Sequence, residues 1–326
     1  MKDELRPPII ILGNTRSGTT VVQKAMAQHG DIADWYEPRT LWLCADPGRA
    51  HDEFDETDAT PEVKRYVRKQ FLKYQQQHGG RVVLEKTPSN ILKIPYVRAI
   101  FPEATYLFIV RSPFSFISSV EFKWQRTLST KGIRRRLKST PVTQLPFYAG
   151  RFVRQYFDKH VLGHKYQATW GPRYKGMDEE LTTLDLMTVI ARQWSVCSRK
   201  AEEAMARCLE PGEVLRLRYE DFVEDPIAHL KRICEHCGIE LTDAMRQFAT
   251  TKVRSDFQEK WRRFEPRELA RILPEIRDEM ARHGYEVPAE VAKASIELHR
   301  ELTASKQGYA ANSGQDRAAM ANRGNA

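Results

Sequence analysis

Residues 8–20 read PIIILGNTRSGTT. The apolar run from Pro8 to Leu12 predicts a buried strand, and residues 13–20 predict a glycine-framed loop that opens directly into a helix. A strand, a glycine-framed loop and a helix N-terminus in this order form a cradle for a phosphate group, because the first N–H groups of the helix and its dipole both favour an anion. We therefore expect an α/β fold of the phosphate-binding-loop (P-loop) type.

The loop differs from that of nucleoside-triphosphate hydrolases and kinases at one position. Gly13 and Gly18 have the usual spacing, but Thr19 stands where those enzymes carry a lysine. The nearest cation, Arg16, lies inside the loop. Such a loop holds an anion with backbone N–H groups, the helix dipole and one guanidinium, yet it lacks the lysine that reaches a γ-phosphate. This pattern predicts binding of a nucleotide phosphate by a protein that is not an ordinary ATPase or kinase.

Composition narrows the class of protein only in part. The chain has 326 residues, of which 41% are hydrophobic, and its 52 basic and 43 acidic residues give a net charge of +9. A basic surplus suits an anionic ligand, a nucleic acid or a membrane surface equally well. Five cysteines do not form a secreted disulfide framework, and Cys234 and Cys237 have metal-ligand spacing without a second pair. With no apolar leader and no membrane-length apolar run, we expect a cytoplasmic protein without an integral membrane segment.

Short apolar runs alternate with helical patterns along the chain. Four runs have the character of buried parallel strands, at residues 8–12, 81–84, 105–110 and 214–217. Helices are predicted at residues 18–28, 61–78, 90–100, 114–126 and 181–209. The alternation predicts a doubly wound, mainly parallel sheet flanked by helices, with ligands at the carboxyl ends of the strands.

Two stretches interrupt this alternation. Residues 127–180 contain Arg134-Arg135-Arg136, several prolines and aromatic residues, and we interpret them as an insertion or a lid on the acceptor side. Residues 304–326 are rich in Ala, Asn, Gly, Ser and Gln, which predicts a disordered tail. We expect a single domain over residues 7–303.

Polar residues follow each predicted strand and form a candidate anion site. The third strand ends in Arg111, where a nucleotide hydrolase carries an aspartate that organises magnesium. An arginine at this position favours phosphate over a metal ion, so we predict no metal site. Glu85-Lys86-Thr87-Pro88 follows the second strand, and Arg218-Tyr219-Glu220-Asp221 follows the fourth. The ring of Tyr219 could lie against a base.

These motifs resemble those of the sulfotransferases that use 3′-phosphoadenosine 5′-phosphosulfate. Residues 13–20 are similar to the 5′-phosphosulfate loop of that family, and Arg111, with Ser119 eight residues later, is similar to its 3′-phosphate motif. Residues 85–88 resemble a segment of the heparan sulfate sulfotransferases. Residues 218–221 resemble the Tyr-Glu segment of the tyrosylprotein and bacterial branches. The resemblance covers residues 7–285 apart from the stretch at 127–180.

The resemblance implies a P-loop enzyme that moves a sulfuryl group in line from this donor to a hydroxyl or amine. The product is adenosine 3′,5′-bisphosphate, and no metal is required. The residues expected to bind the donor are Arg16, Ser17, Gly18, Thr19 and Thr20 at the 5′-phosphosulfate, Arg111 and Ser119 at the 3′-phosphate, Tyr219 near the adenine, and Ser255 and Lys260 in a closing loop.

The transfer also needs a base and a group that stabilises the leaving phosphate. Glu37 lies 21 residues after Arg16, at a position that resembles the catalytic glutamate of the tyrosylprotein and heparan sulfate branches. We predict that Glu37 is the base and that Lys86 sits opposite Arg16. Glu85 is the second candidate base, and an ion pair with Arg39 or Arg16 is the alternative role of Glu37.

Other readings of the sequence remain open at this point. A P-loop nucleoside kinase shares the fold, and a polyanion-binding protein could use residues 134–136. For a sulfotransferase, the basic stretch at 127–180 and the similarity of residues 85–88 favour a carbohydrate acceptor such as an anionic glycan. A small hydroxylated metabolite, a lipid or a tyrosyl peptide is the alternative.

Overall fold

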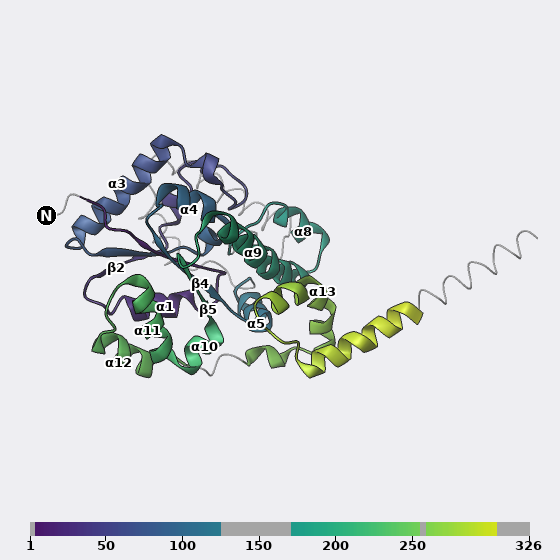
Figure 1. Ribbon diagram of the computed structural model, residues 1–326. Helices are drawn as coiled ribbons and strands as arrows, with labels where there is room; N and C mark the ends of the chain where they lie inside the picture. Colours follow the sequence, from purple (N-terminus) through teal and green to yellow (C-terminus); the bar gives the residue numbers. More distant parts are fainter. Residues whose placement is uncertain (1–3, 125–170, 255–258, 305–326) are drawn as a thin grey trace, which may run out of the picture. The chain divides into compact units, whose positions relative to one another are not determined.

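The computed structural model describes residues 4–124, 171–254 and 259–304 (Figure 1). The contacts within the chain form two compact units, Met1–Trp261 and Arg262–Ala326. In the second unit, helix α13 (Pro266–Arg282) begins with a capping box in which the Glu265 N–H donates to the Glu268 carboxylate at 3.2 Å. Residues 289–304 are also helical. The single domain expected over residues 7–303 stays a prediction.

The first unit is built on a sheet of five strands that all run parallel. Their bounds are β1 Ile9–Gly13, β2 Ile32–Tyr36, β3 Val82–Lys86, β4 Thr105–Val110 and β5 Val214–Arg218. The order across the sheet is β2-β3-β1-β4-β5, so β1 is central and its phosphate-binding loop leaves the middle of the carboxyl edge. The predicted doubly wound parallel sheet is confirmed.

The edge strand β2 is absent from the four strands predicted by the sequence. Its residues, IADWY, mix aliphatic, acidic and aromatic side chains, and only Ile32 and Ala33 are buried. Trp35 stacks on Tyr74 at a centroid distance of 4.3 Å, so an aromatic contact rather than an apolar run supports this strand. An edge strand that is buried on one side lacks the continuous apolar signal of the central strands.

Helices connect successive strands, and further helices come after the last strand in the chain. Their bounds in the first unit are α1 Thr19–Met26, α2 Arg39–Trp42, α3 Pro61–Gln77, α4 Ile94–Ile100, α5 Pro113–Trp124, α8 Met177–Thr183, α9 Leu186–Cys208, α10 Tyr219–Glu224, α11 Pro226–Cys237 and α12 Asp243–Lys252. Short 3₁₀ turns lie at Glu56–Asp58, Pro88–Leu92 and Lys260–Arg263. The helix predicted at 181–209 is in fact two helices, because Asp185 caps α9 by accepting from the N–H groups of Met187 and Thr188.

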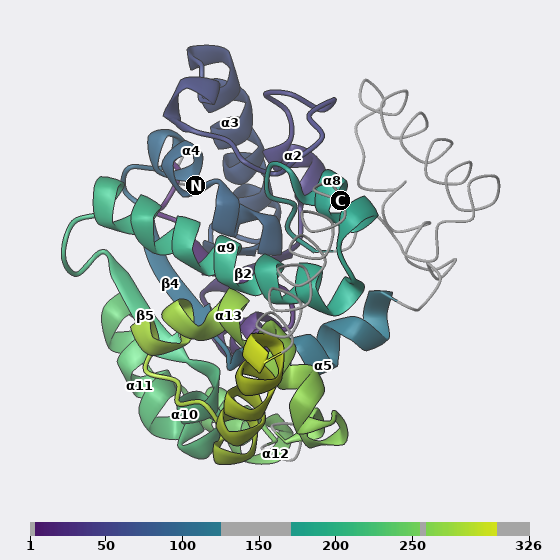
Figure 2. The same ribbon diagram turned by 90° about the vertical axis from the view of Figure 1, so that its right-hand side faces the viewer.

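The helices cover both faces of the sheet (Figures 1 and 2). Side chains of β1 alternate between the faces, and Ile9 and Ile11 pack in one core with α1, α10, α11 and α12. The opposite face is covered by α3, α4 and α9 (Figure 2). There Trp194 and Phe71 are fully buried. Because helices cover both faces of the sheet, a ligand site is expected at its carboxyl edge.

Only the end of the predicted insertion is among the described residues. Residues 127–170 lie outside them, whereas 171–180 pack within the first unit: Arg173 and Tyr174 are buried, and the Asp52 N–H donates to the Arg173 carbonyl at 2.7 Å. Beyond residue 304, the predicted tail also lies outside the described residues. Within the part of the chain that the structure describes, no helix combines the length and apolar character needed to cross a membrane.

Candidate active site

The loop between β1 and α1 is held tightly against its neighbours. A Cβ atom on Gly13 would lie 2.5 Å from the Ile109 carbonyl oxygen, so β1 and β4 can approach closely here only with glycine. Gly18 is the N-cap of α1, with a φ of 87°, and the first N–H groups of the helix follow it. The Ser17 hydroxyl is buried and has no hydrogen-bond partner among the described residues. The loop therefore presents N–H groups and an unused hydroxyl, the donor set that suits a phosphate.

Three of the side chains expected at the two phosphates of the donor lie together. The Arg16 Nε donates to the Ser119 hydroxyl at 2.9 Å, and the Arg111 Nη1 donates to the Arg16 carbonyl at 3.0 Å. Arg16 is exposed, with a positive φ of 63°, while Arg111 is buried. The sheet thus brings an arginine of the loop beside an arginine at the end of β4, and both can contact one anionic ligand.

Tyr219 lies at the start of α10, just beyond β5, and its ring contacts the loop. A Cβ atom on Gly18 would lie 2.0 Å from the Tyr219 Cδ2 atom, so the ring packs directly on the Gly18 backbone. The Arg111 guanidinium carbon lies 4.8 Å from the centroid of the same ring. Tyr219 therefore stands between the loop and Arg111.

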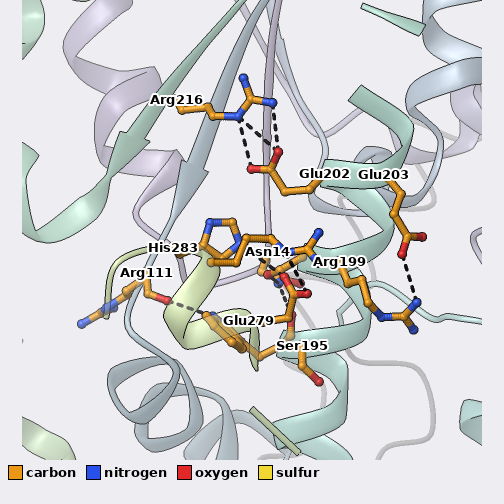
Figure 3. Close-up of polar contacts among 12 residues, drawn as sticks. Asn14, Arg111, Ser195, Arg199, Glu202, Glu203, Arg216, Glu279 and His283 are labelled. Carbon is orange, nitrogen blue, oxygen red and sulfur yellow. Dashed lines mark hydrogen bonds and ion pairs between the residues drawn. The ribbon is translucent and has the colours of Figure 1, made fainter. Parts of the chain in front are cut away.

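Helix α9 supports this arrangement from behind. The Asn14 side-chain amide donates to the Trp194 carbonyl and to the Ser198 hydroxyl, both at 3.3 Å, and the Trp194 indole N–H donates to the Arg111 carbonyl at 2.8 Å (Figure 3). Glu202 of the same helix pairs with Arg216 of β5 at 2.9 Å (Figure 3). One helix thus fixes the backbone of both the loop and Arg111. Sequence reasoning missed Asn14 and Trp194 as supports of the site, because Trp194 reads as part of an ordinary packing stripe.

Glu37 lies just after β2 and forms two ion pairs. Its Oε1 atom is 2.7 Å from the Lys86 ammonium and its Oε2 atom is 3.3 Å from the Arg39 guanidinium. Its side chain remains 16% exposed. Burial raises the pKa of Glu37, but Arg39, Lys86 and a hydrogen bond from Tyr36 outweigh it and hold that pKa below its usual range. Glu37 is therefore ionised near neutral pH and still reaches solvent.

Lys86 ends β3 in register with Ile11 of β1, so it shares the carboxyl edge with the loop. Its side chain is 1% exposed, and its Nζ atom lies 4.2 Å from the centroid of the Tyr36 ring. Burial lowers the pKa of Lys86, and the neighbouring Glu37 carboxylate opposes that shift. The closest contact that the structure gives Lys86 is thus with Glu37, and its placement opposite Arg16 stays a prediction.

Glu85, the second candidate base, lies inside the core. Its carboxyl group is fully buried and accepts hydrogen bonds from the Trp42 indole at 2.9 Å, the Thr87 hydroxyl at 2.5 Å and the Asn90 amide at 3.0 Å. Burial raises the pKa of Glu85 to about 7. The Glu85 carboxyl is enclosed by these three donors, so of the two carboxylates only Glu37 reaches solvent.

The comparisons with known proteins agree with this geometry. A family model described as the sulfotransferase family matches residues 7–165 and 165–243. The chain belongs to the sulfotransferase family. The match also runs through the whole stretch at 127–180, for which the motifs alone indicated no counterpart in the family.

The individual relatives of this sulfotransferase are distant. The nodulation protein NoeE of Sinorhizobium fredii is 24% identical over 129 residues, which are 35% of this chain and 31% of that protein. The omega-hydroxy-beta-dihydromenaquinone-9 sulfotransferase Stf3 of Mycobacterium tuberculosis is 22% identical over 272 residues, 72% of this chain and 63% of that protein. The chain therefore spans less than two thirds of the length of both relatives.

Solved structures share the fold of this sulfotransferase. The sulfotransferase domain from the curacin biosynthetic pathway superposes with a TM-score of 0.53 at 16% identity, over 87% of this chain and all of that domain. At this identity the likeness supports the fold alone.

The contacts given above do not test the residues predicted for the closing loop. Ser255 lies outside the described residues, and Lys260 is exposed at the start of the 3₁₀ turn Lys260–Arg263. Cys234 and Cys237 lie on α11, as expected for a helix. Across residues 4–124, 171–254 and 259–304, no group of three or more His, Cys, Asp or Glu side chains is arranged to hold a metal ion. The closing-loop role of Ser255 and Lys260 stays a prediction.

Proposed function

We propose that this sulfotransferase moves a sulfuryl group from 3′-phosphoadenosine 5′-phosphosulfate to an acceptor hydroxyl or amine. The observation that carries the proposal is the convergence of Arg16, Arg111 and Ser119 beside the N-terminus of α1. The donor carries a 5′-phosphosulfate and a 3′-phosphate on one nucleoside, so it needs two anion sites. Arg16, after β1, and Arg111, after the neighbouring strand β4, would provide one cation for each.

The loop residues are proposed to bind the 5′-phosphosulfate. The backbone N–H groups of residues 18–20, the buried Ser17 hydroxyl and the exposed Arg16 guanidinium offer donors without a metal ion. Arg111 and Ser119 would bind the 3′-phosphate. Tyr219 is close enough to the loop to border the adenine, and Lys86 would offset the charge that develops on the leaving phosphate.

Glu37 is proposed to act as the general base. It takes the proton of the acceptor as the new bond to sulfur forms, and the bond from sulfur to the bridging phosphate oxygen breaks with its electron pair going to adenosine 3′,5′-bisphosphate. The exposed edge of its carboxylate and its depressed pKa support this role, since the group is ready to accept a proton at neutral pH. Its ion pairs with Lys86 and Arg39 fix the orientation of the carboxylate.

A carbohydrate is the proposed acceptor. The ring of Tyr36 is 40% exposed and lies next to Glu37 in the chain, so a sugar ring could rest on it while its hydroxyl meets the base. A small hydroxylated metabolite is the second candidate, and the name of Stf3, whose acceptor is an omega-hydroxylated menaquinone, favours it.

Transfer of radiolabelled sulfate from the donor tests the proposal directly. Wild-type protein is assayed with glycans, phenols, tyrosyl peptides and hydroxylated lipids, in excess chelator and in magnesium. We expect transfer in chelator, and turnover lower by about 100-fold or more in Arg16→Ala and Arg111→Ala, the scale of losing one charge-stabilising donor. Arg199→Ala is a matched control, because Arg199 pairs with Glu203 on the surface of α9. Full turnover in both site variants, or strict dependence on magnesium, would contradict the proposal.

A further inference from the structure

The ring of Tyr219 fills the space between the phosphate-binding loop and the arginine at the end of β4. Three ring atoms of Tyr219 would lie 2.0–2.8 Å from a Cβ atom built on Gly18, so the ring rests on bare backbone. The Arg111 guanidinium lies over the ring at 4.8 Å from its centroid. The ring is 9% exposed, and both of these contacts are made by residues expected to hold the donor.

These contacts link the phosphate-binding loop, Tyr219 and Arg111 to one another. Arg111 donates to the Arg16 carbonyl at 3.0 Å, its guanidinium lies over Tyr219, and Tyr219 packs on Gly18 in the same loop as Arg16. The backbone of Arg111 is fixed separately by the Trp194 indole at 2.8 Å. A long arginine side chain has several rotamers, and a flat ring beneath its guanidinium restricts them.

We propose that Tyr219 is a positioning residue that sets the distance between the loop and the Arg111 guanidinium, so that one nucleotide can contact both. This inference rests on the proposed donor. It assigns the aromatic ring, rather than the hydroxyl, as the part of Tyr219 that acts. It also explains Gly18, because any side chain at this position would displace the ring and with it the guanidinium.

This role differs measurably from a direct contact with the adenine. A residue that stacks on the base contributes equally to every adenine nucleotide. A residue that positions Arg111 contributes only to nucleotides that carry a 3′-phosphate. The ratio of the dissociation constants of adenosine 5′-monophosphate and adenosine 3′,5′-bisphosphate isolates the 3′-phosphate contribution from the rest of the binding.

The experiment measures both dissociation constants by calorimetry for the wild type, Tyr219→Phe, Tyr219→Met and Arg111→Ala. We expect Tyr219→Phe to keep the wild-type ratio within about threefold, because the ring remains. Tyr219→Met keeps a similar apolar volume without a ring face, and we expect its ratio to fall about tenfold or more, the order of a displaced charge-assisted hydrogen bond. In Tyr219→Met/Arg111→Ala the ratio should equal that of Arg111→Ala alone, because the ring then has no guanidinium to position.

The other outcomes of this experiment contradict either the positioning role of Tyr219 or the donor assignment. Equal weakening of both nucleotides by Tyr219→Met would replace the positioning role with an adenine contact. Wild-type affinity of Tyr219→Met for both nucleotides would overturn the positioning role as well. If Tyr219→Met does not fold, as judged by its circular dichroism and thermal transition, Tyr219→Leu and the ring-preserving Tyr219→Phe provide the same comparison. A wild-type protein that binds neither nucleotide would contradict the donor assignment itself, whereas wild-type discrimination with an unchanged ratio in the variants would contradict only the role of Tyr219.

Discussion

Replacement of the proposed base by its neutral isostere, Glu37→Gln, separates chemistry from donor binding. The glutamine keeps the shape of the side chain, but it cannot take the proton of the acceptor. Loss of a general base lowers turnover by about 10²–10⁴-fold, which is about 3–5 kcal/mol of transition-state stabilisation. No donor contact is assigned to Glu37, so the dissociation constant of adenosine 3′,5′-bisphosphate should stay within a few fold of wild type.

The same substitution also changes the surroundings of Lys86. The Lys86 ammonium lies 2.7 Å from the Glu37 carboxylate and is 1% exposed, so it loses its nearest counter-charge. The amide oxygen of glutamine still accepts its hydrogen bond, and we therefore expect a loss of unfolding free energy of about 1–2 kcal/mol rather than the ~3–5 kcal/mol of a fully broken buried pair. The pKa of Lys86, already lowered by burial, should fall further.

Turnover, nucleotide calorimetry and urea unfolding measure these three quantities. Glu53→Gln serves as the matched control, because Glu53 also pairs with a lysine ammonium, that of Lys200, at 2.7 Å, and neither residue has a role in the proposed reaction. The reasoning is refuted if Glu37→Gln turns over at the wild-type rate. Loss of nucleotide binding together with turnover would instead assign Glu37 a structural role through its ion pairs.

Four further substitutions test the buried and paired charges of the first unit. Burial raises the pKa of Glu37, but Arg39 and Lys86 outweigh this effect and hold the pKa below its usual range. Arg39→Ala should therefore raise the pKa of Glu37 and move the acid limb of the kcat/KM profile to higher pH, as measured by initial rates. The raised pKa of Glu85 means that its contribution to stability is complete below about pH 4.5 and is lost as the pH rises through about 7, so Glu85→Gln should flatten the pH dependence of unfolding free energy in that interval. Lys93 is buried and lies 3.1 Å from the Asp52 carboxylate. Lys93→Met should lower the unfolding free energy by about 3 kcal/mol in urea, and adding Asp52→Asn should restore part of it.

The central part of the fold could be predicted because its strands are continuous apolar runs. Strands β1 and β4 are buried almost throughout and carry unbroken aliphatic or aromatic sequence. Strand β2 could not be predicted in this way, since its stability comes from Trp35 packing on Tyr74 of a helix that lies far along the chain. The break between α8 and α9 could have been predicted, because Asp185 is a typical N-cap residue. The helical pattern on both sides of Asp185 favoured one long helix instead.

Candidate site residues could be named one by one from the sequence, but the contacts between them could not. Arg16, Arg111 and Glu37 each stand in a recognisable local motif. The hydrogen bond from Arg16 to Ser119 joins residues 103 positions apart, and the one from Asn14 to Ser198 joins residues 184 positions apart. Such pairings depend on the order of the strands and on the helix that crosses behind them, which no local pattern encodes.

A crystal structure with adenosine 3′,5′-bisphosphate, grown with magnesium present, tests the central claim most directly. We predict that the 5′-phosphate lies within hydrogen-bond distance of the N–H groups of residues 18–20 and of Arg16. We also predict the 3′-phosphate on Arg111 and Ser119, with no divalent ion between either phosphate and the protein. A nucleotide bound elsewhere on the chain, or held to it through magnesium, would contradict the account.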